Sequence, residues 1–267
     1  MLAFANAKIN LGLHVIRKRP DGYHDLETVF YPVKVTDVVE ITDALETSCV
    51  IRGIDVPGSS QDNICLKAYH LLAADFTLPP QCITLLKNIP VGAGLGGGSA
   101  DAAFLIKLLN DKFELGLSLG QMEAYAAKLG ADCPFFIRNT PVFAGGIGDQ
   151  FTEIELDLSA YYLVLAKPPV HVSTADAYSG IKPVLPSTSL KDLIPLPIRE
   201  WKSRLVNDFE QTVFSKYPQV EALKAALYDA GAVYAAMSGS GSSVFGIFEK
   251  ETRLPELEKE NQVFYNV

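Results

Sequence analysis

The sequence predicts an α/β protein of two domains, and three observations support this fold class. The chain has 267 residues, more than one hydrophobic core usually organises, although one large α/β domain stays open. Both strand-like and helix-like segments occur along its first half. Its last third contains a helix, a strand, a loop and a strand, which predicts an α+β module. A hydrophobic fraction of 48% supplies enough apolar residues for a sizeable core.

The N-terminal segment predicts a β-hairpin. Apolar and polar residues alternate over residues 8–16, so that one face of the strand is buried and the other carries Lys8 and Asn10. An Asp-Gly step then favours a turn, and an apolar segment over residues 26–35 predicts the second strand.

A glycine-rich loop stands between a predicted strand over residues 82–86 and a predicted helix over residues 99–110. Residues 90–103 have the sequence PVGAGLGGGSADAA, with five glycines within seven residues. Because glycine lacks a Cβ atom and tolerates positive φ, successive backbone amides can converge on an anion. A helix that opens near Ser99, with Ser99 or a neighbour as its expected N-cap, adds unpaired amides and the positive end of its dipole. The loop therefore predicts phosphate binding.

The other elements are predicted from periodicity and from turn residues. A helix over residues 118–129 is expected to end at Gly130, a usual C-cap position. Asp132 stands directly before a Cys-Pro pair, a pattern typical of a helix N-cap with proline in the first turn. A domain boundary is expected between residues 150 and 160. Further helices are expected over residues 63–76 and 219–230, and strands over 161–166, 233–237 and 244–248.

Composition and charge exclude several classes of function. The net charge is −8 and no run of Lys or Arg could follow a nucleic acid backbone, so no nucleic-acid partner is expected. A small anionic substrate stays open, since local cations can attract it. The four cysteines lack CxxC spacing, which predicts neither a zinc site nor disulfides. The sequence has no signal peptide and no apolar run of about 20 residues, so we expect a cytoplasmic protein without a membrane partner. We expect a monomer or weak dimer.

The glycine loop alone leaves alternatives. Residues 92–97 satisfy the G-x-G-x-x-G pattern of a Rossmann dinucleotide site. However, the preceding strand ends in Pro90, the glycines continue to Gly98, and no acidic residue ends a strand about 20 residues later. A Walker A loop is excluded, because no G-K-[ST] follows. A flexible surface loop without function also stays open.

Three motifs together resemble the signatures of the GHMP kinases, a superfamily of small-molecule kinases. They occupy residues 5–11, 90–99 and 237–242. Within that superfamily, residues 19–24, the triple-glycine loop, residues 130–135 and residues 207–210 resemble the branch that acts on a cytidine-diphosphate sugar alcohol.

The resemblance covers nearly the whole chain, from residue 5 to residue 248. It implies a ribosomal-protein-S5-like ATP-binding domain over residues 1–153 and a ferredoxin-like C-terminal domain over residues 154–267.

The resemblance implies ATP-dependent phosphorylation of an alcohol, with Lys8 and Asp132 as the catalytic residues. Asp132 would orient the substrate hydroxyl and accept its proton, and Lys8 would stabilise the developing charge. A carboxylate beside a lysine is a weak base, but in a loose transition state the hydroxyl keeps its proton until late, so positioning matters more. Simpler roles stay open: a solvent-exposed lysine for Lys8 and a helix cap for Asp132.

The same resemblance implies the binding residues. Tyr23 would stack on cytosine, His24 would bond to its polar edge and Asn10 would contact the sugar alcohol, although Tyr23 and His24 could instead pack over the core. Ser240 and Gly241 complete the expected substrate residues, with a tight β-turn as the alternative. The expected ATP contacts are Pro90, Val91, Gly92, Ala93, Gly94, Leu95, Gly96, Gly97, Gly98, Ser99, Ala100, Asn63 and Lys87. Ordinary exposed polar side chains explain Asn63 and Lys87 almost as well.

Mg²⁺ is expected as the counter-ion of ATP, with Ser99 as the one obvious protein ligand. Three positions depart from the family pattern. Ala100 stands where a second serine is usual, Asp149 stands where glutamate is expected, and Ser242-Ser243 replaces a proline followed by threonine or serine. None of these departures changes the catalytic pair.

Three other functions stay open. A GHMP kinase for homoserine or mevalonate would have no use for the pair Tyr23 and His24. A nicotinamide-dependent oxidoreductase would bind NAD at the glycine loop. A nucleotide-binding module without catalysis would not need Asp132.

Overall fold

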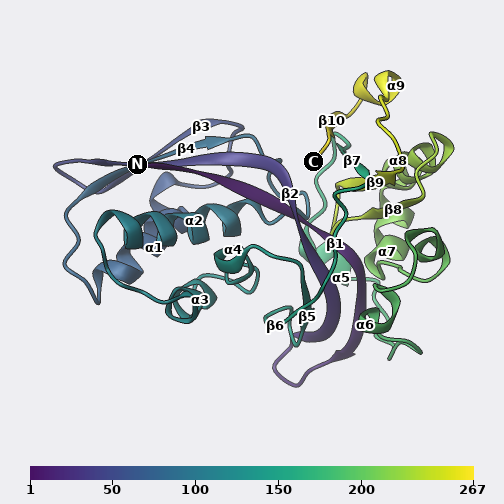
Figure 1. Cartoon of the computed structure of the whole chain (residues 1–267), viewed down its shortest axis with the longest axis horizontal. Coiled ribbons are helices and arrows are strands. Elements are labelled where there is room, and N and C mark those ends of the chain that lie inside the picture. Colours follow the sequence, from purple (N-terminus) through teal and green to yellow (C-terminus); the bar gives the residue numbers. More distant parts are fainter. The chain divides into compact units, whose positions relative to one another are not determined.

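The computed structural model describes residues 1–267, apart from the side chain of Ser60. The chain forms two compact units, each built from separate stretches. Strands β1 (Leu2–Lys18) and β2 (His24–Asp43) each run through both units (Figure 1). Unit 1 comprises residues 1–7, 35–91 and 96–140, and unit 2 comprises residues 8–34, 92–95 and 141–267.

These units differ from the contiguous domains 1–153 and 154–267 expected from the sequence. The physical reason is the length of the first two strands, which have 17 and 20 residues where the periodicity predicted about half as many. Residues 8–34 therefore pack with the later part of the chain.

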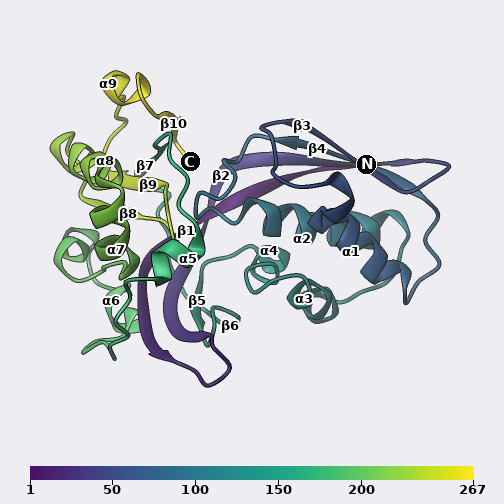
Figure 2. The ribbon, with the colours of Figure 1, turned by 180° about the vertical axis from the view of Figure 1, so that it is seen from behind.

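Unit 1 contains a mixed sheet with helices on one face. The second half of β2 pairs antiparallel with β4 (Gln81–Lys87), and β4 pairs parallel with β3 (Ser48–Gly53). Helices α1 and α2 lie side by side along this sheet (Figures 1 and 2). The helices are α1 (Ile64–Ala73), α2 (Gly97–Lys112), α3 (Leu119–Ala127) and α4 (Phe135–Arg138), with a 3-10 helix at Ser60–Asp62.

Unit 2 contains two groups of strands. The first half of β2 pairs antiparallel with β5 (Val142–Gly145), which pairs antiparallel with β6 (Gln150–Glu153). A four-stranded antiparallel sheet has the order β10-β7-β9-β8, in which the strands stand fourth, first, third and second along the chain. This is the ferredoxin-like order that the resemblance implied. The strands are β7 (Tyr162–Lys167), β8 (Tyr234–Met237), β9 (Val244–Phe248) and β10 (Gln262–Tyr265).

Helices α7 and α8 pack with this four-stranded sheet around a core that includes Val164, Val213, Leu223 and Phe248. The helices of unit 2 are α5 (Thr174–Tyr178), α6 (Leu190–Leu193), α7 (Phe209–Lys216), α8 (Pro218–Asp229) and α9 (Pro255–Glu258), with a 3-10 helix at Ile198–Ser203. Among the residues that the structure describes, no helix is long and apolar enough to cross a membrane.

Three predicted helix ends are wrong. Helix α2 begins two residues earlier than expected, with Gly96 at the N-cap in a left-handed conformation (φ 70°), so Ser99 does not cap it. Helix α3 ends with a right-handed C-cap at Lys128, so Gly130 is not its cap. Asp132 lies in the turn before α4, whose N-cap is Pro134, and is not a helix cap.

A buried charge cluster joins three elements of unit 1. The Lys87 ammonium at the end of β4 contacts the carboxylates of Asp37 on β2 and Asp101 on α2, and all three side chains are 0–4% exposed. The pKa of Asp101 is raised to about 7, chiefly by burial; the Lys87 charge lowers it and the Asp37 charge raises it. The cluster therefore anchors α2 to the sheet. Removing one of its charged groups would leave a buried charge without its partner and would destabilise the fold.

Replacing Lys87 by methionine is expected to destabilise the protein, because two buried carboxylates would then face each other. We expect the free energy of unfolding, measured by urea titration, to fall by about 3–5 kcal/mol. The matched control is Lys112→Met, whose partner Asp43 has an 83% exposed side chain and whose ion pair contributes about 1 kcal/mol or less. Equal losses in the two variants would contradict a stabilising role for the buried cluster.

Candidate active site

The tip of the glycine-rich loop, residues 92–95, belongs to unit 2, and two of its residues are glycines with positive φ. Gly94 has a φ of +78°, and a Cβ atom there would lie 2.0 Å from the carbonyl oxygen of Ser238. Gly92 has a φ of +62°, and its Cβ atom would lie 2.5 Å from the His171 imidazole. At both positions the positive φ favours glycine, and at Gly94 the neighbouring backbone also leaves no room for a Cβ atom. Contacts of this kind fix the loop, so the alternative of a flexible surface loop is wrong.

The loop's entry and exit lie in unit 1. One oxygen of the Asp37 carboxylate accepts hydrogen bonds from the backbone amides of Asn88 and Ile89, at 2.6 and 2.8 Å. Its other oxygen would lie 3.5 Å from a Cβ atom at Gly97, the first residue of α2. Gly98 faces open space, with no atom within 4 Å of a Cβ position. The first turn of α2 thus combines amides without helical partners with an unobstructed approach, as an anion requires.

Ser99 brings the start of α2 next to the Asp132 turn. Burial raises the pKa of the Cys133 thiol to about 11, and a hydrogen bond with the Ser99 side chain opposes this rise. Cys133 is fully buried and directly follows Asp132. The predicted catalytic carboxylate therefore belongs to a turn that packs against the predicted phosphate-binding helix end, within unit 1.

Lys8 and Asn10 form a buried polar pair on β1. The Lys8 side chain is only 4% exposed, so the alternative of a solvent-exposed lysine is wrong. Its ammonium donates to Asn10 Oδ1 at 2.6 Å and lies 4.5 Å from the centre of the Phe30 ring. The side-chain amide of Asn10 in turn donates to Thr28 Oγ1 at 2.9 Å, which fixes the orientation of the Asn10 side chain. The Lys8 backbone amide donates to the Leu95 carbonyl at 3.0 Å, which joins this strand directly to the glycine loop.

Tyr23 and His24 lie in different surroundings at the turn of the β1–β2 hairpin. Tyr23 is 61% exposed, so the alternative that it packs over the core is wrong for this residue. The His24 ring stacks on Tyr178, with ring centres 4.8 Å apart and planes inclined by 26°. Tyr178 also meets Phe209 edge to face at 4.7 Å. Sequence reasoning missed Tyr178, because it lies about 150 positions from the hairpin in a loop-rich stretch.

Ion pairs hold the hairpin turn that carries Tyr23. Arg19 pairs with Asp21 at 2.9 Å and with Asp25 at 3.1 Å, and Asp21 also accepts a hydrogen bond from the Tyr23 amide at 3.1 Å. Hydrogen bonding to Arg19 lowers the pKa of Asp21. The turn can therefore present the tyrosine ring while its backbone stays fixed.

The C-terminal glycine-rich turn packs on the first glycine loop. The Ser238 hydroxyl donates to the Gly94 carbonyl at 2.8 Å and accepts from the backbone amide of Asn10 at 3.2 Å. The Gly241 amide donates to the Ser238 carbonyl at 2.9 Å, which gives the tight turn expected as an alternative. Substrate contacts by Ser240 and Gly241 stay a prediction.

Asn63 and Lys87 have structural partners in unit 1. The Asn63 side chain caps α1 by accepting from the Cys65 amide at 2.8 Å. Lys87 contacts two carboxylates in the cluster described above. Both side chains therefore already bond to other groups of the protein, and their contacts with ATP stay predictions.

The three departures from the family pattern have local explanations. Ala100 is fully buried in the first turn of α2, where a larger side chain would need room. Asp149 accepts a hydrogen bond from the Ile147 amide at 3.2 Å within its turn. The Ser242 hydroxyl donates to the Val170 carbonyl at 2.8 Å, and the buried Ser243 hydroxyl has no partner among the described residues.

Mg²⁺ would find few protein ligands here. Among the described residues, no three His, Cys, Asp or Glu side chains are grouped closely enough to hold a metal ion. The Ser99 hydroxyl and the Asp132 carboxylate in the neighbouring turn each offer oxygen to a metal ion. This donor set fits Mg²⁺, which usually keeps several waters and binds through one or two protein oxygens and the phosphates of a nucleotide.

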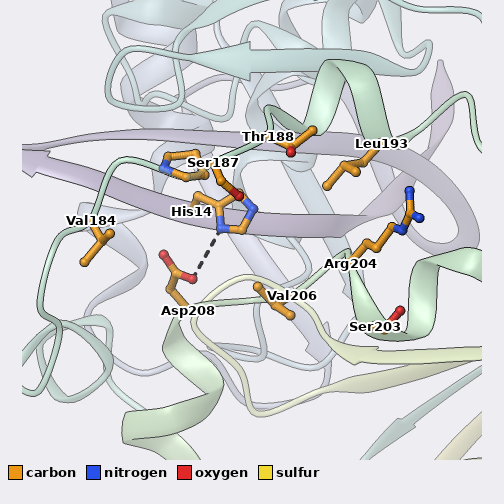
Figure 3. Close-up of a pocket in the computed structure, with 10 residues that line it drawn as sticks. His14, Val184, Ser187, Thr188, Leu193, Ser203, Arg204, Val206 and Asp208 are labelled. Carbon is orange, nitrogen blue, oxygen red and sulfur yellow. Dashed lines mark hydrogen bonds and ion pairs between the residues drawn. The ribbon is translucent and has the colours of Figure 1, made fainter.

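A separate cavity of about 470 Å³ lies in unit 2 (Figure 3). His14 on β1 contacts Asp208 at the cavity wall, with Nδ1 and Oδ1 3.3 Å apart, and Arg204 lines another part of the wall. None of its lining residues is a predicted site residue. The cavity therefore does not belong to the site predicted from the sequence.

Known proteins with similar sequences are named as kinases. Residues 63–140 match the family described as GHMP kinases N terminal domain, and residues 198–266 match GHMP kinases C terminal. The chain is 56% identical over 256 residues to the 4-diphosphocytidyl-2-C-methyl-D-erythritol kinase of Parabacteroides distasonis, covering 96% of this chain and 94% of that protein.

Two solved structures resemble the whole chain. A crystal structure of 4-(cytidine 5'-diphospho)-2C-methyl-D-erythritol kinase has a TM-score of 0.83 at 29% identity, covering 99% of this chain and 98% of that one. The Methanococcus jannaschii mevalonate kinase has a TM-score of 0.73 at 13% identity, covering 99% and 97%, which is a likeness of fold.

Two alanine substitutions separate loop packing from ligand approach. Gly94→Ala combines a strained φ with a backbone clash, so we expect thermal unfolding to show a loss of about 1–3 kcal/mol. Gly98→Ala meets open space in a helix and should keep or raise stability by up to about 1 kcal/mol. Its new methyl group should nevertheless weaken the binding of an ATP analogue in calorimetry. Unchanged affinity in Gly98→Ala would show that no phosphate approaches this residue.

Proposed function

The chain belongs to the 4-diphosphocytidyl-2-C-methyl-D-erythritol kinases of the GHMP kinase family, and on this premise we propose the roles of its site residues. It is a small-molecule kinase with the two-domain GHMP kinase fold. It transfers the γ-phosphate of ATP to the 2-hydroxyl of 4-diphosphocytidyl-2-C-methyl-D-erythritol, in the non-mevalonate route to isoprenoid precursors. Action on a small molecule in the cytoplasm, as a monomer or weak dimer, belongs to the same proposal.

The glycine loop and the first turn of α2 bind the ATP phosphates in this proposal. The single observation that carries it is the hydrogen bond from the Lys8 amide to the Leu95 carbonyl, since it joins the strand of the predicted catalytic lysine to the loop. The open approach at Gly98 leaves the helix amides accessible to an anion. Mg²⁺, when bound with ATP, would neutralise phosphate charge and be held in part by the Ser99 hydroxyl.

Lys8 and Asp132 carry the chemistry in this proposal. Asp132 orients the 2-hydroxyl and takes up its proton late in the transfer, when the bond to phosphorus is largely formed. The Lys8 ammonium is held by Asn10 and stabilises negative charge as it develops. Because both groups act mainly through position, the fixed orientation of the Lys8–Asn10 pair supports this mechanism.

The hairpin turn selects the cytidine part of the substrate in this proposal. The exposed Tyr23 ring offers a face for stacking, and the stacked pair of His24 and Tyr178 offers an aromatic wall with ring nitrogens that can bond to a cytosine edge. Homoserine and mevalonate have no base to use these rings. The oxidoreductase alternative is rejected, because the chain belongs to a kinase family.

Substrate choice can be measured directly by coupling ADP release to an indicator reaction. We expect turnover with 4-diphosphocytidyl-2-C-methyl-D-erythritol and little or none with homoserine or mevalonate. The variant Tyr23→Ala should raise KM for the cytidine substrate by about 10-fold, the equivalent of one lost stacking contact, with little change in KM for ATP. Turnover of homoserine or mevalonate alone would overturn the substrate assignment, and an unaltered KM in Tyr23→Ala would overturn the stacking role.

The catalytic pair can be tested by variants that keep side-chain size. Asp132→Asn and Lys8→Met should each lower kcat by about 10²–10⁴-fold while the affinity for an ATP analogue changes much less. Asp229→Asn, an exposed carboxylate at the end of α8, is the matched control and should keep wild-type turnover. Wild-type kcat in either test variant would remove that residue from the mechanism.

A further inference from the structure

The segment Asn207–Glu210 resembles the family but has no role in the mechanism above. Its polar side chains each hold another element of unit 2. Asp208 accepts from the Val15 amide at 2.8 Å and faces His14 (Figure 3). Glu210 accepts from the Met237 amide at 2.8 Å and from the Lys224 ammonium at 2.6 Å. The segment thus fixes both β1 and the end of β8.

Asn207 makes the contacts nearest to the site. Its side chain is buried, and its amide nitrogen donates to the carbonyls of Met237 and Gly239, each at 2.8 Å. Its oxygen accepts from the Phe209 amide at 3.0 Å. The two carbonyls need hydrogen-bond donors and the Phe209 amide needs an acceptor. A side-chain amide supplies both kinds of group.

The turn that Asn207 holds is the one that supports the site. The two carbonyls that bond to Asn207 belong to Met237 and Gly239, so they lie on either side of Ser238. The Ser238 hydroxyl donates to the Gly94 carbonyl of the phosphate loop and accepts from the backbone amide of Asn10. Asn10 in turn holds the Lys8 ammonium. Hydrogen bonds, joined by the backbone of residues 237–239 and by Asn10 itself, therefore lead from Asn207 to the loop tip and to the predicted catalytic lysine.

We propose that Asn207 is a positioning residue for phosphoryl transfer, which fixes the Ser238 turn so that Gly94 and Lys8 keep their places. The proposal rests on the proposed function. Asn207 acts only through the turn. A shift of the turn would move both the phosphate-loop tip and the strand of Lys8, and displacements of about 1 Å can cost about 100-fold in rate.

The isosteric variant Asn207→Asp tests this role. An ionised carboxylate there would face two carbonyls without a proton to donate, so kcat/KM for ATP should fall by about 10–100-fold at pH 8. The matched control is Asn261→Asp, which also removes an amide that donates to a backbone carbonyl, that of Leu257 at 2.9 Å, away from the turn. The control should stay within about 2-fold of wild type.

A pH series separates positioning from general destabilisation. Burial favours the protonated form of the new carboxyl group, which raises its pKa and lets its O–H donate to one carbonyl at lower pH. The ratio of Asn207→Asp to wild-type kcat/KM should therefore rise by several-fold between pH 8 and pH 6, while the Asn261→Asp ratio stays flat. Other charged groups nearby are His14 on β1, Asp208 and Glu210 on the same segment and Lys224 on α8. Their titration affects wild type and variant alike, so dividing the variant's kcat/KM by that of wild type removes it.

Two further measurements keep the test decisive. If Asn207→Asp does not fold, Ser238→Ala, which removes the hydroxyl contacts to Gly94 and Asn10, should lower kcat/KM for ATP by about 10-fold or more. The affinity for a non-hydrolysable ATP analogue, measured by calorimetry, should fall in either variant. This readout needs no turnover, so it tests Asn207 even if the wild-type protein fails to phosphorylate the cytidine substrate, a result that overturns only the proposed function.

The proposal is overturned by either of two results. One is an equal effect of Asn207→Asp and Asn261→Asp on kcat/KM and on analogue affinity. The other is a fall in the midpoint of unfolding with wild-type kcat/KM and analogue affinity for the folded fraction. With Ser238→Ala as the only folded variant, wild-type kinetics and affinity overturn it in the same way.

Discussion

The contact between the backbones of Gly94 and Ser238 is the constraint on which the site depends. The two residues lie 144 positions apart in the sequence, yet a Cβ atom at Gly94 would stand 2.0 Å from the Ser238 carbonyl oxygen. Any side chain on Gly94 would separate the two turns. Because they meet through main-chain atoms, the same turn can hold the loop tip through Gly94 and the strand of Lys8 through Asn10.

Two buried polar side chains, Asp37 and Asn207, reinforce this arrangement, and each has several partners. Asp37 uses both carboxylate oxygens, one for two backbone amides at the loop's entry and the other for Lys87. Asn207 donates its side-chain amide to two carbonyls of the C-terminal turn and accepts at its oxygen from the Phe209 amide. Buried groups of this kind are costly when unpaired, so they specify one conformation of the backbone that they hold. Precise placement is what a loose phosphoryl transfer requires from a protein.

The sequence predicted those features whose cause is local. Alternating apolar residues predicted the middle of β1, and the helix predicted over residues 118–129 is present as α3. The glycines of the loop were recognised because positive φ and the absence of Cβ atoms are properties of the residue itself. The family resemblance supplied the fold, the reaction and the expected roles of Lys8 and Asp132, since it compares whole motifs and their order.

Features that depend on distant partners could not be predicted in this way. The alternation of β1 placed Lys8 on its polar face, but only the folded chain shows that this face is buried beside Asn10 and Phe30. Tyr178 and His24 stack although no local pattern links them. Ser99 was expected to cap α2, but the αL conformation of Gly96 starts the helix earlier. In each case tertiary packing decided what local propensity left open.

Phosphorus NMR of the reaction mixture tests the central claim most directly, because it identifies the new bond as well as the consumption of ATP. With ATP, Mg²⁺ and 4-diphosphocytidyl-2-C-methyl-D-erythritol, we predict one new phosphomonoester resonance, coupled to the methylerythritol C2, that grows in step with ADP while the cytidine diphosphate resonances remain. Formation of ADP and inorganic phosphate without the phosphomonoester, or no consumption of ATP, would contradict the account.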